Sequence, residues 1–316
     1  MATLNLTPAR AYELAPTRRR RAPLHTRARR HVTGYLFLAG ALFCFGFFSW
    51  YPIGREMAMS FQGDIQTGHA TWVGLANFRH ITNDTQFWTA WKASIAFTGL
   101  ALVLGYAMPF AVAVAINEFR HLRGYFRLLV YLPVMMPPVA AAVLWKYFYT
   151  PGQAGMFNAV LHVLHLPMSN WTQSANTTVV MLSLVLFSTW SNMGGATLVY
   201  LAALQDIPGE LYESAELAGA GVLRKIWHVT IPQTRIILSL MFVLQIVATM
   251  QVFMEPFILT GGGPEGKTTS VVFLIYEYAF HFFNYGGAAA LSALLLVVLA
   301  VFGGAYIWLS NRADRA

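Results

Sequence analysis

The polar stretch from Glu213 to Pro232 carries the most specifically spaced residues of this 316-residue chain. Glu210, Glu213 and Glu216 recur every third residue, so on a helix they form one acidic ridge. Gly219-Ala220-Gly221 then provides small residues where the chain must turn closely. A separate apolar stripe is formed by Leu211, Ala215, Ala218 and Val222. Glu213 can pair with a basic group, and no residue of this stretch is expected to make or break covalent bonds.

Two physical interpretations of this stretch remain open. It is a rigid knob that enters a partner's groove, or an amphipathic helix that lies on lipid headgroups, and both need the same stripe. Asp206 is expected to cap the first short helix, with Pro208 in its first turn. A second short helix with Arg224 and Lys225 follows, and Pro232 leads into the next apolar run.

Covalent chemistry and metal binding are not predicted. The chain has no His-Glu-x-x-His motif, and His162 and His165 have no neighbouring acidic residue, so they are interpreted as surface residues. The single cysteine, Cys44, excludes an intrachain disulfide. We therefore expect no catalytic residue, no metal and no cofactor. A membrane-embedded enzyme is the alternative that this argues against.

The composition predicts an all-α membrane protein. The chain is 57% hydrophobic and only 11% charged, far from the balance of a soluble domain. A bilayer needs about 20 mostly apolar residues per helix. Six stretches satisfy this: Tyr35–Ile53, Ala93–Ile116, Tyr125–Tyr149, Thr177–Leu204, Ile236–Leu259 and Ala288–Leu309. The third contains Pro133, Pro137 and Pro138, which favour a kinked helix, with two half-helices as the alternative.

Lysine and arginine give the orientation, because they accumulate in cytoplasmic loops. The predicted cytoplasmic side has sixteen of the 21: Arg10, Arg18, Arg19, Arg20, Arg21, Arg27, Arg29, Arg30, Arg120, Arg123, Arg127, Arg224, Lys225, Arg235, Arg312 and Arg315. Both termini and the Glu213 loop are then cytoplasmic. The Arg-rich tail is predicted to be disordered before His31 and to contact anionic lipid. No folded nucleic-acid-binding domain accompanies the tail, so nucleic-acid binding is not expected.

Polar side chains within the spans are candidates for solute contacts. Asn192 and Gln251 are as well suited to hydrogen bonds between helices as to a solute. Glu255, a carboxylate near the outer end of its run, either reads a hydroxyl or amine of the solute or lies at the headgroups. Trp145, Tyr147 and Tyr149 are interpreted as an interfacial aromatic belt.

Four segments resemble the permeases of ABC importers, in particular the carbohydrate-uptake branch of the maltose and glycerol-phosphate type. The Glu213–Pro232 stretch resembles their "EAA" coupling loop, with Ser214, Ala218 and Ile231 departing from its pattern. Ala218 stands where that pattern has an aspartate. The other segments are Trp145–Asn158, the Leu259–Pro264 turn and Tyr276–Ala289.

This resemblance implies a type I ABC-importer permease fold in a prokaryotic plasma membrane. It divides the chain into a cytoplasmic tail (1–33), a first transmembrane helix with an outer loop (34–91) and a permease domain (92–312), with the coupling loop at about 206–235. The implied partners are an ATP-binding ABC subunit, a second homologous permease, an extracytoplasmic solute-binding protein, membrane lipid and a sugar. Contact with the ATPase is implied for Glu213, Ser214, Ala215, Gly219, Ala220 and Pro232.

By the same resemblance the solute pathway includes Ser191, Asn192, Gly195 and Gln251, with Glu255 added from its position in the run. The Leu259–Pro264 turn is both an ordinary exposed turn and a surface for the binding protein. The predicted function is half of the pathway of an ATP-driven, binding-protein-dependent sugar importer, with ATP hydrolysis in a separate chain. The alternative is a nucleotide-independent channel or an ion-coupled carrier, although no inverted repeat is evident.

Overall fold

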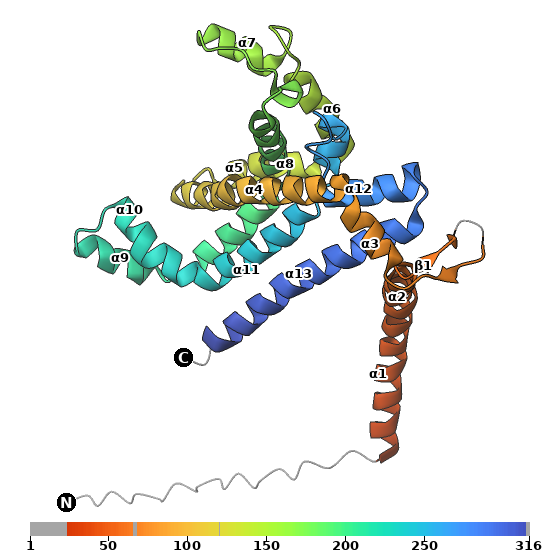
Figure 1. Cartoon of the computed structure of the whole chain (residues 1–316). Coiled ribbons are helices and arrows are strands. Elements are labelled where there is room, and N and C mark those ends of the chain that lie inside the picture. The colour runs from red at the N-terminus through yellow and green to blue at the C-terminus, as the bar shows by residue number, and fades with distance from the viewer. Residues whose placement is uncertain (1–23, 66–67, 120, 314–316) are drawn as a thin grey trace, which may run out of the picture. The chain divides into compact units, whose positions relative to one another are not determined.

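The computed structural model describes residues 24–65, 68–119 and 121–313. Within them the regular secondary structure is helical, except for one antiparallel hairpin in which β1 (Gln62–Gly63) pairs with β2 (Thr71–Trp72). It divides into two compact units, Met1–Arg55 and Glu56–Ala316 (Figure 1).

The first unit is helical from its first described residue to its end. It contains α1 (Leu24–Phe45), a π-helical turn η1 (Gly46–Trp50) and the start of α2 (Tyr51–Met59). Its apolar side chains, such as Phe37 and Phe48, are exposed over most of their surface. Such a surface suits lipid, not water. The predicted disorder before His31 is wrong from Leu24 onward, and residues 1–23 lie outside the described part.

The second unit contains the remaining helices. The first group is α3 (Ala76–Asn83), α4 (Thr85–Glu118), α5 (Arg123–Tyr131), η3 (Leu132–Met135), α6 (Pro138–Phe148), α7 (Met156–Val163), η4 (Trp171–Gln173) and α8 (Thr177–Gln205). The second group is α9 (Gly209–Leu217), α10 (Val222–Lys225), η5 (Ile226–Thr230), α11 (Ile231–Met250), η6 (Pro256–Thr260), α12 (Val271–Tyr276), η7 (Glu277–His281) and α13 (Tyr285–Ala313).

Five of the described helical stretches are long and apolar enough to cross a membrane, and a bent pair makes a sixth. The predicted all-α fold with six spans is confirmed. The second and fourth spans begin at side-chain caps. Asp84 accepts a hydrogen bond from the Gln86 amide and starts α4, and Asn176 accepts one from the Thr178 amide and starts α8. These caps satisfy amides that have no partner within the helix.

The structure of the third span differs from the predicted one. It is not one kinked helix but two, Arg123–Met135 and Pro138–Phe148, bent by 96° relative to each other. Met136 and Pro137 adopt extended backbone dihedrals between them. A proline disfavours helical dihedrals in the residue before it, and Pro137 and Pro138 restrict two successive residues in this way. The alternative of two half-helices is the one observed.

The bounds of the fifth span also differ from the predicted ones. Its helix ends at Met250, nine residues before the predicted end at Leu259, and begins earlier, since α10, η5 and α11 are continuous from Val222. Helical structure resumes only at Met254. Gln251 and Glu255 therefore lie on either side of an interruption of the helix, and not within one helix.

The aromatic belt predicted after the third span is only partly present. Tyr147 is 62% exposed, but Trp145 and Tyr149 are 8% and 1% exposed and belong to the core. The Trp145 ring contacts several other rings, and the Tyr149 hydroxyl donates to the Ser183 carbonyl at 2.7 Å. Buried aromatic rings in mutual contact form a packing unit, in which the Tyr149 hydroxyl is hydrogen-bonded but Trp145 Nε1 has no partner among the described residues. They fix α6 against α8.

Candidate functional site

The predicted coupling loop is a helical hairpin between α8 and α11, with α9 as its first arm and α10 and η5 as its second (Figure 1). Gly219 closes α9 with φ of +74°, a value that glycine adopts at little cost. The Gly219 amide donates to the Glu216 carbonyl, and the Ala220 amide donates to the Ala215 carbonyl, both at 2.9 Å. This pair of bonds is the Schellman arrangement of helix ends. The turn therefore closes through its backbone, and the residue type of Ala218 does not matter for it.

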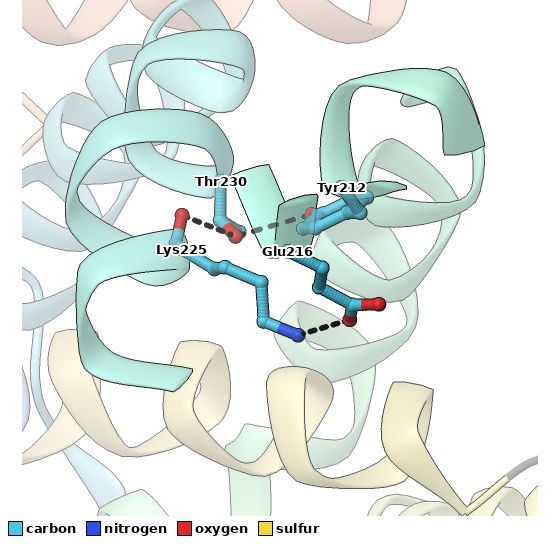
Figure 2. Close-up of polar contacts among 4 residues, drawn as sticks. All are labelled: Tyr212, Glu216, Lys225 and Thr230. Carbon is cyan, nitrogen blue, oxygen red and sulfur yellow. Dashed lines mark hydrogen bonds and ion pairs between the residues drawn. The ribbon is translucent and has the colours of Figure 1, made fainter. Parts of the chain in front are cut away.

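Two polar contacts join the arms of this hairpin (Figure 2). The Lys225 ammonium lies 2.6 Å from a Glu216 carboxylate oxygen. The Tyr212 and Thr230 hydroxyl oxygens are 3.1 Å apart, and Thr230 also donates to the Lys225 carbonyl at 3.5 Å. Since Thr230 is buried while Glu216 is exposed, one contact lies at the base of the hairpin and the other nearer the surface. Together they hold α9 in one orientation relative to α10.

The acidic ridge predicted from the sequence is divided by these contacts. Glu216 is bound to Lys225, whereas Glu213 is exposed and no hydrogen bond or ion pair of its carboxylate is observed among the described residues. The Ser214 hydroxyl donates to the Glu210 carbonyl one turn earlier, at 2.7 Å. Ala215 and Ala220 are half-buried in the turn, and Pro232 is exposed in the first turn of α11.

The predicted cap at Asp206 is wrong. Asp206 ends α8, and the residue that precedes α9 is Pro208, which provides no side-chain hydrogen bond. Sequence reasoning also missed the exposed apolar tip of the hairpin. Leu217 is 92% exposed, and Leu223 and Trp227 are 74% and 67% exposed. Large apolar side chains exposed on a polar element are typical of a binding site.

A second candidate site is a cavity of about 320 Å³ between α4, α8 and α11 and the break that follows α11. Its lining includes Asn192, Gln251 and Glu255, three of the five predicted pathway residues. Ser191 and Gly195 are not among its lining residues. The Ser191 hydroxyl is buried without a hydrogen-bond partner in the described part of the chain, and a side chain at Gly195 would enter open space.

The side-chain amides of Asn192 and Gln251 donate hydrogen bonds to backbone carbonyls of the helices that carry them. Asn192 Nδ2 donates to the Ser188 carbonyl, and Gln251 Nε2 to the Val247 carbonyl, both at 2.9 Å and one turn back. The hydrogen bonds between helices that were the alternative for these residues are not observed. Gln245 provides one instead, a long contact of 3.5 Å from Nε2 to the Ala101 carbonyl of α4.

The absence of a side chain at Gly105 leaves room for side chains of the two neighbouring helices against α4. A side chain at Gly105 of α4 would collide with the Gln245 amide and with the Thr189 hydroxyl. Small residues let membrane helices approach and bring polar groups within reach. Glu255 and Ser188 both line the cavity that these helices enclose.

Metal ligands are not gathered anywhere in the described residues, where no group of three or more His, Cys, Asp or Glu side chains forms a candidate site. His162 and His165 are both exposed. This is the surface position that the sequence predicted.

Residues 105–315 match the family described as "Binding-protein-dependent transport system inner membrane component". The chain is 31% identical to the probable ABC transporter permease protein YurN of Bacillus subtilis over 84% of this chain and 92% of that protein. It is 28% identical to the arabinooligosaccharides transport system permease protein AraP of Bacillus subtilis, over 84% and 85%.

Solved structures agree with this match. The chain resembles a subunit of a bacterial ABC transporter involved in the import of the acidic polysaccharide alginate, with a TM-score of 0.79 and 26% identity over 92% of this chain and 98% of that chain. A further structure shows the bacterial alginate ABC transporter in complex with a periplasmic protein bound to an alginate pentasaccharide, with a TM-score of 0.78 and 25% identity over the same shares.

Proposed function

The chain belongs to the binding-protein-dependent transport system inner membrane components, and we propose that it is the permease subunit of an ATP-driven sugar importer. Members of this family are transport components and not enzymes. In this proposal the chain forms half of the translocation pathway. ATP hydrolysis takes place in a separate cytoplasmic subunit, and a second homologous permease provides the other half.

The sugar assignment rests on the relatives and on the cavity. AraP carries arabinooligosaccharides by name, and the alginate transporter imports a polysaccharide. The cavity combines hydroxyl and amide side chains with the apolar surfaces of Phe97 and Phe253. Sugars need both, because their hydroxyl groups require hydrogen bonds while their ring faces pack against apolar groups. Ser191 and Gly195, outside this lining, remain proposed contacts only for a pathway completed by the second permease.

Coupling is proposed to run through the hairpin of α9 and α10. Its arms are joined by the Glu216–Lys225 and Tyr212–Thr230 contacts, so force on its tip is transmitted to α11 without bending the hairpin. The hairpin presents Glu213, whose carboxylate is free to pair with a basic group, next to the exposed apolar tip. An apolar helical knob with a charged rim is suited to a groove in another protein. Ser214, Ala215, Gly219, Ala220 and Pro232 shape that knob.

The remaining assignments follow from the family. The protein is a multi-pass membrane protein. We place both termini and the α9–α10 hairpin in the cytoplasm, from the distribution of lysine and arginine. An external solute-binding protein delivers the sugar. We retain the division into a tail (1–33), a first helix with an outer loop (34–91) and a permease domain (92–312).

Co-purification of ATP hydrolysis tests this function. Affinity-tagged chain is isolated from its own membranes in mild detergent, and ATPase activity per permease is measured. We expect activity with the wild type and a loss of about tenfold with Glu213→Arg, because reversal of an interfacial charge places like charges together. Glu56→Arg, an exposed acidic residue of α2, is the matched control and retains the activity. Transport without any co-purified ATPase would support the channel or ion-coupled carrier instead.

A further inference from the structure

The lining of the cavity between α4, α8 and α11 contains an acidic side chain but no basic one. Its one ionisable lining side chain is Glu255, and none of its lining residues is lysine, arginine or histidine. The other polar side chains are neutral: Ser188, Thr189, Asn192, Gln245, Thr249 and Gln251. An anionic solute in this cavity would therefore meet hydrogen-bonding groups but no positive charge on this chain.

The end of α11 adds to this polarity. The helix ends at Met250, and Ala248, Thr249 and Gln251 all line the cavity. The C-terminal end of a helix carries a partial negative charge of about half an electron, from carbonyl groups that lack a partner within the helix. That end attracts cations and disfavours anions. The Val247, Ala248 and Thr249 carbonyl groups at this end accept hydrogen bonds from Gln251 and from the Val252 amide, so it is the dipole of the whole helix that adds to the negative potential of the cavity.

The fold itself does not determine the charge of the solute. The alginate transporter, which resembles this chain over nearly its whole length, imports an acidic polysaccharide. Discrimination must therefore come from the lining of the pathway. A carboxyl group accepts hydrogen bonds from hydroxyl groups and, when ionised, attracts an ammonium group and repels a carboxylate. Its effect is stronger inside a protein than in water.

We propose that Glu255 and the end of α11 make this pathway selective for neutral and amine-bearing sugars and exclude sugars with a carboxylate or phosphate group. This inference rests on the proposed function, since it assigns the charge class of the solute to the same cavity.

Equilibrium binding to the complete transporter in lipid nanodiscs, without the solute-binding protein, tests this selectivity. The probes are a panel of disaccharides in which each neutral skeleton is paired with its amino form and its uronate form. For the skeleton that binds best, we expect the uronate to bind about tenfold more weakly than the neutral form, as befits one close like charge. In Glu255→Gln, which keeps the shape of the side chain, the difference shrinks to about threefold or less. Glu56→Gln removes an acidic charge outside the cavity and keeps the wild-type ratio.

Three results would overturn the inference. One is a uronate that binds the wild type as tightly as its neutral partner, which needs no variant to fold. Another is an unchanged ratio in Glu255→Gln. The third is the absence of binding by every probe while ATPase activity still co-purifies with the chain. In that last case the importer assignment stands and only the role of Glu255 fails, whereas loss of co-purification in the wild type contradicts the proposed function itself.

Discussion

At the scale of single residues, the α9–α10 hairpin depends on a few contacts between its arms. Lys225 is the most informative, because its ammonium group reaches across the turn to Glu216 while its backbone carbonyl accepts a hydrogen bond from Thr230. It is therefore shared by both polar contacts. Glu213, three residues before Glu216, makes neither contact and remains available to a partner. The two acidic residues have different roles despite their regular spacing.

Reversal of the Lys225 charge tests whether the Glu216–Lys225 ion pair holds the two arms of the hairpin together. In Lys225→Glu two carboxylates face each other, so α9 is released from α10 while Glu213 and the turn are unchanged. We expect solute-stimulated ATP hydrolysis in the reconstituted transporter to fall about tenfold, since like charges in contact repel. The reciprocal double variant Glu216→Lys with Lys225→Glu restores the pair and most of the activity. A double variant as defective as the single one would contradict a role for this ion pair.

Gly219 provides a backbone test with a control two residues away. Alanine at Gly219 must adopt φ of +74°, which costs about 1–2 kcal/mol, whereas Gly221 has φ of −69° and tolerates a side chain. Neither position has an atom within 4 Å of a new Cβ, so only the dihedral differs. We expect tryptic cleavage after Arg224 to be about fivefold faster in Gly219→Ala, in proportion to hairpin opening. Equal rates in Gly219→Ala and Gly221→Ala would show that the turn does not limit opening.

At the scale of elements, hydropathy predicted where helices lie but not where they break. The spans of α4, α8 and α13 follow from their long apolar runs. The end of α11 does not, because Val252, Phe253 and Met254 continue the apolar run through the break. Hydropathy reports transfer from water and is insensitive to a change of chain direction. The prolines of the third span did carry a signal, but proline allows both a kink and a 96° bend.

The candidate site shows the same limit. The spacing of Glu213, Gly219 and Pro232 located the hairpin, since glycine and proline have strong backbone preferences. The Glu216–Lys225 pair was not predictable, because nine residues and a reversal of chain direction separate its members. The cavity was located only in part. Asn192 and Gln251 are polar residues in apolar runs, and that pattern is visible in the sequence. Whether Ser191 faces the cavity depends on how α8 packs, which the sequence does not show.

The packing of α8 against α5 leads to a prediction at this scale. A Cβ at Gly194 would press on the Val130 carbonyl and on the Tyr131 Cα, which are backbone atoms and cannot move aside singly. Overpacking of this kind costs about 1–3 kcal/mol. We expect Gly194→Ala to lower the apparent midpoint of thermal unfolding in detergent by several degrees. Gly195→Ala, one residue on and facing open space, serves as the control and should leave the midpoint unchanged. The same midpoint in both variants would place α5 elsewhere.

At the scale of the whole molecule, the distribution of charge and the length of α8 together predict a topology. α7 precedes α8 and α9 follows it, so these two short helices lie at opposite ends of α8. With 29 residues at about 1.5 Å per residue, α8 is long enough to cross a bilayer. If α7 is outside, α9 is inside, and the arginines around the hairpin lie where cytoplasmic loops accumulate positive charge.

Cysteine accessibility tests this topology directly. Cys44 is the only cysteine, so Cys44→Ser gives a background into which His162→Cys on α7 or Glu213→Cys on α9 is introduced singly. Both positions are exposed, which makes the two labels comparable. In intact cells a membrane-impermeant maleimide should label His162→Cys and leave Glu213→Cys unlabelled, and inside-out vesicles should show the reverse. The background chain, with no cysteine, controls for other proteins. Labelling of Glu213→Cys in intact cells would place the hairpin outside, where no ATPase subunit can reach it, and the coupling proposal would fall with the topology.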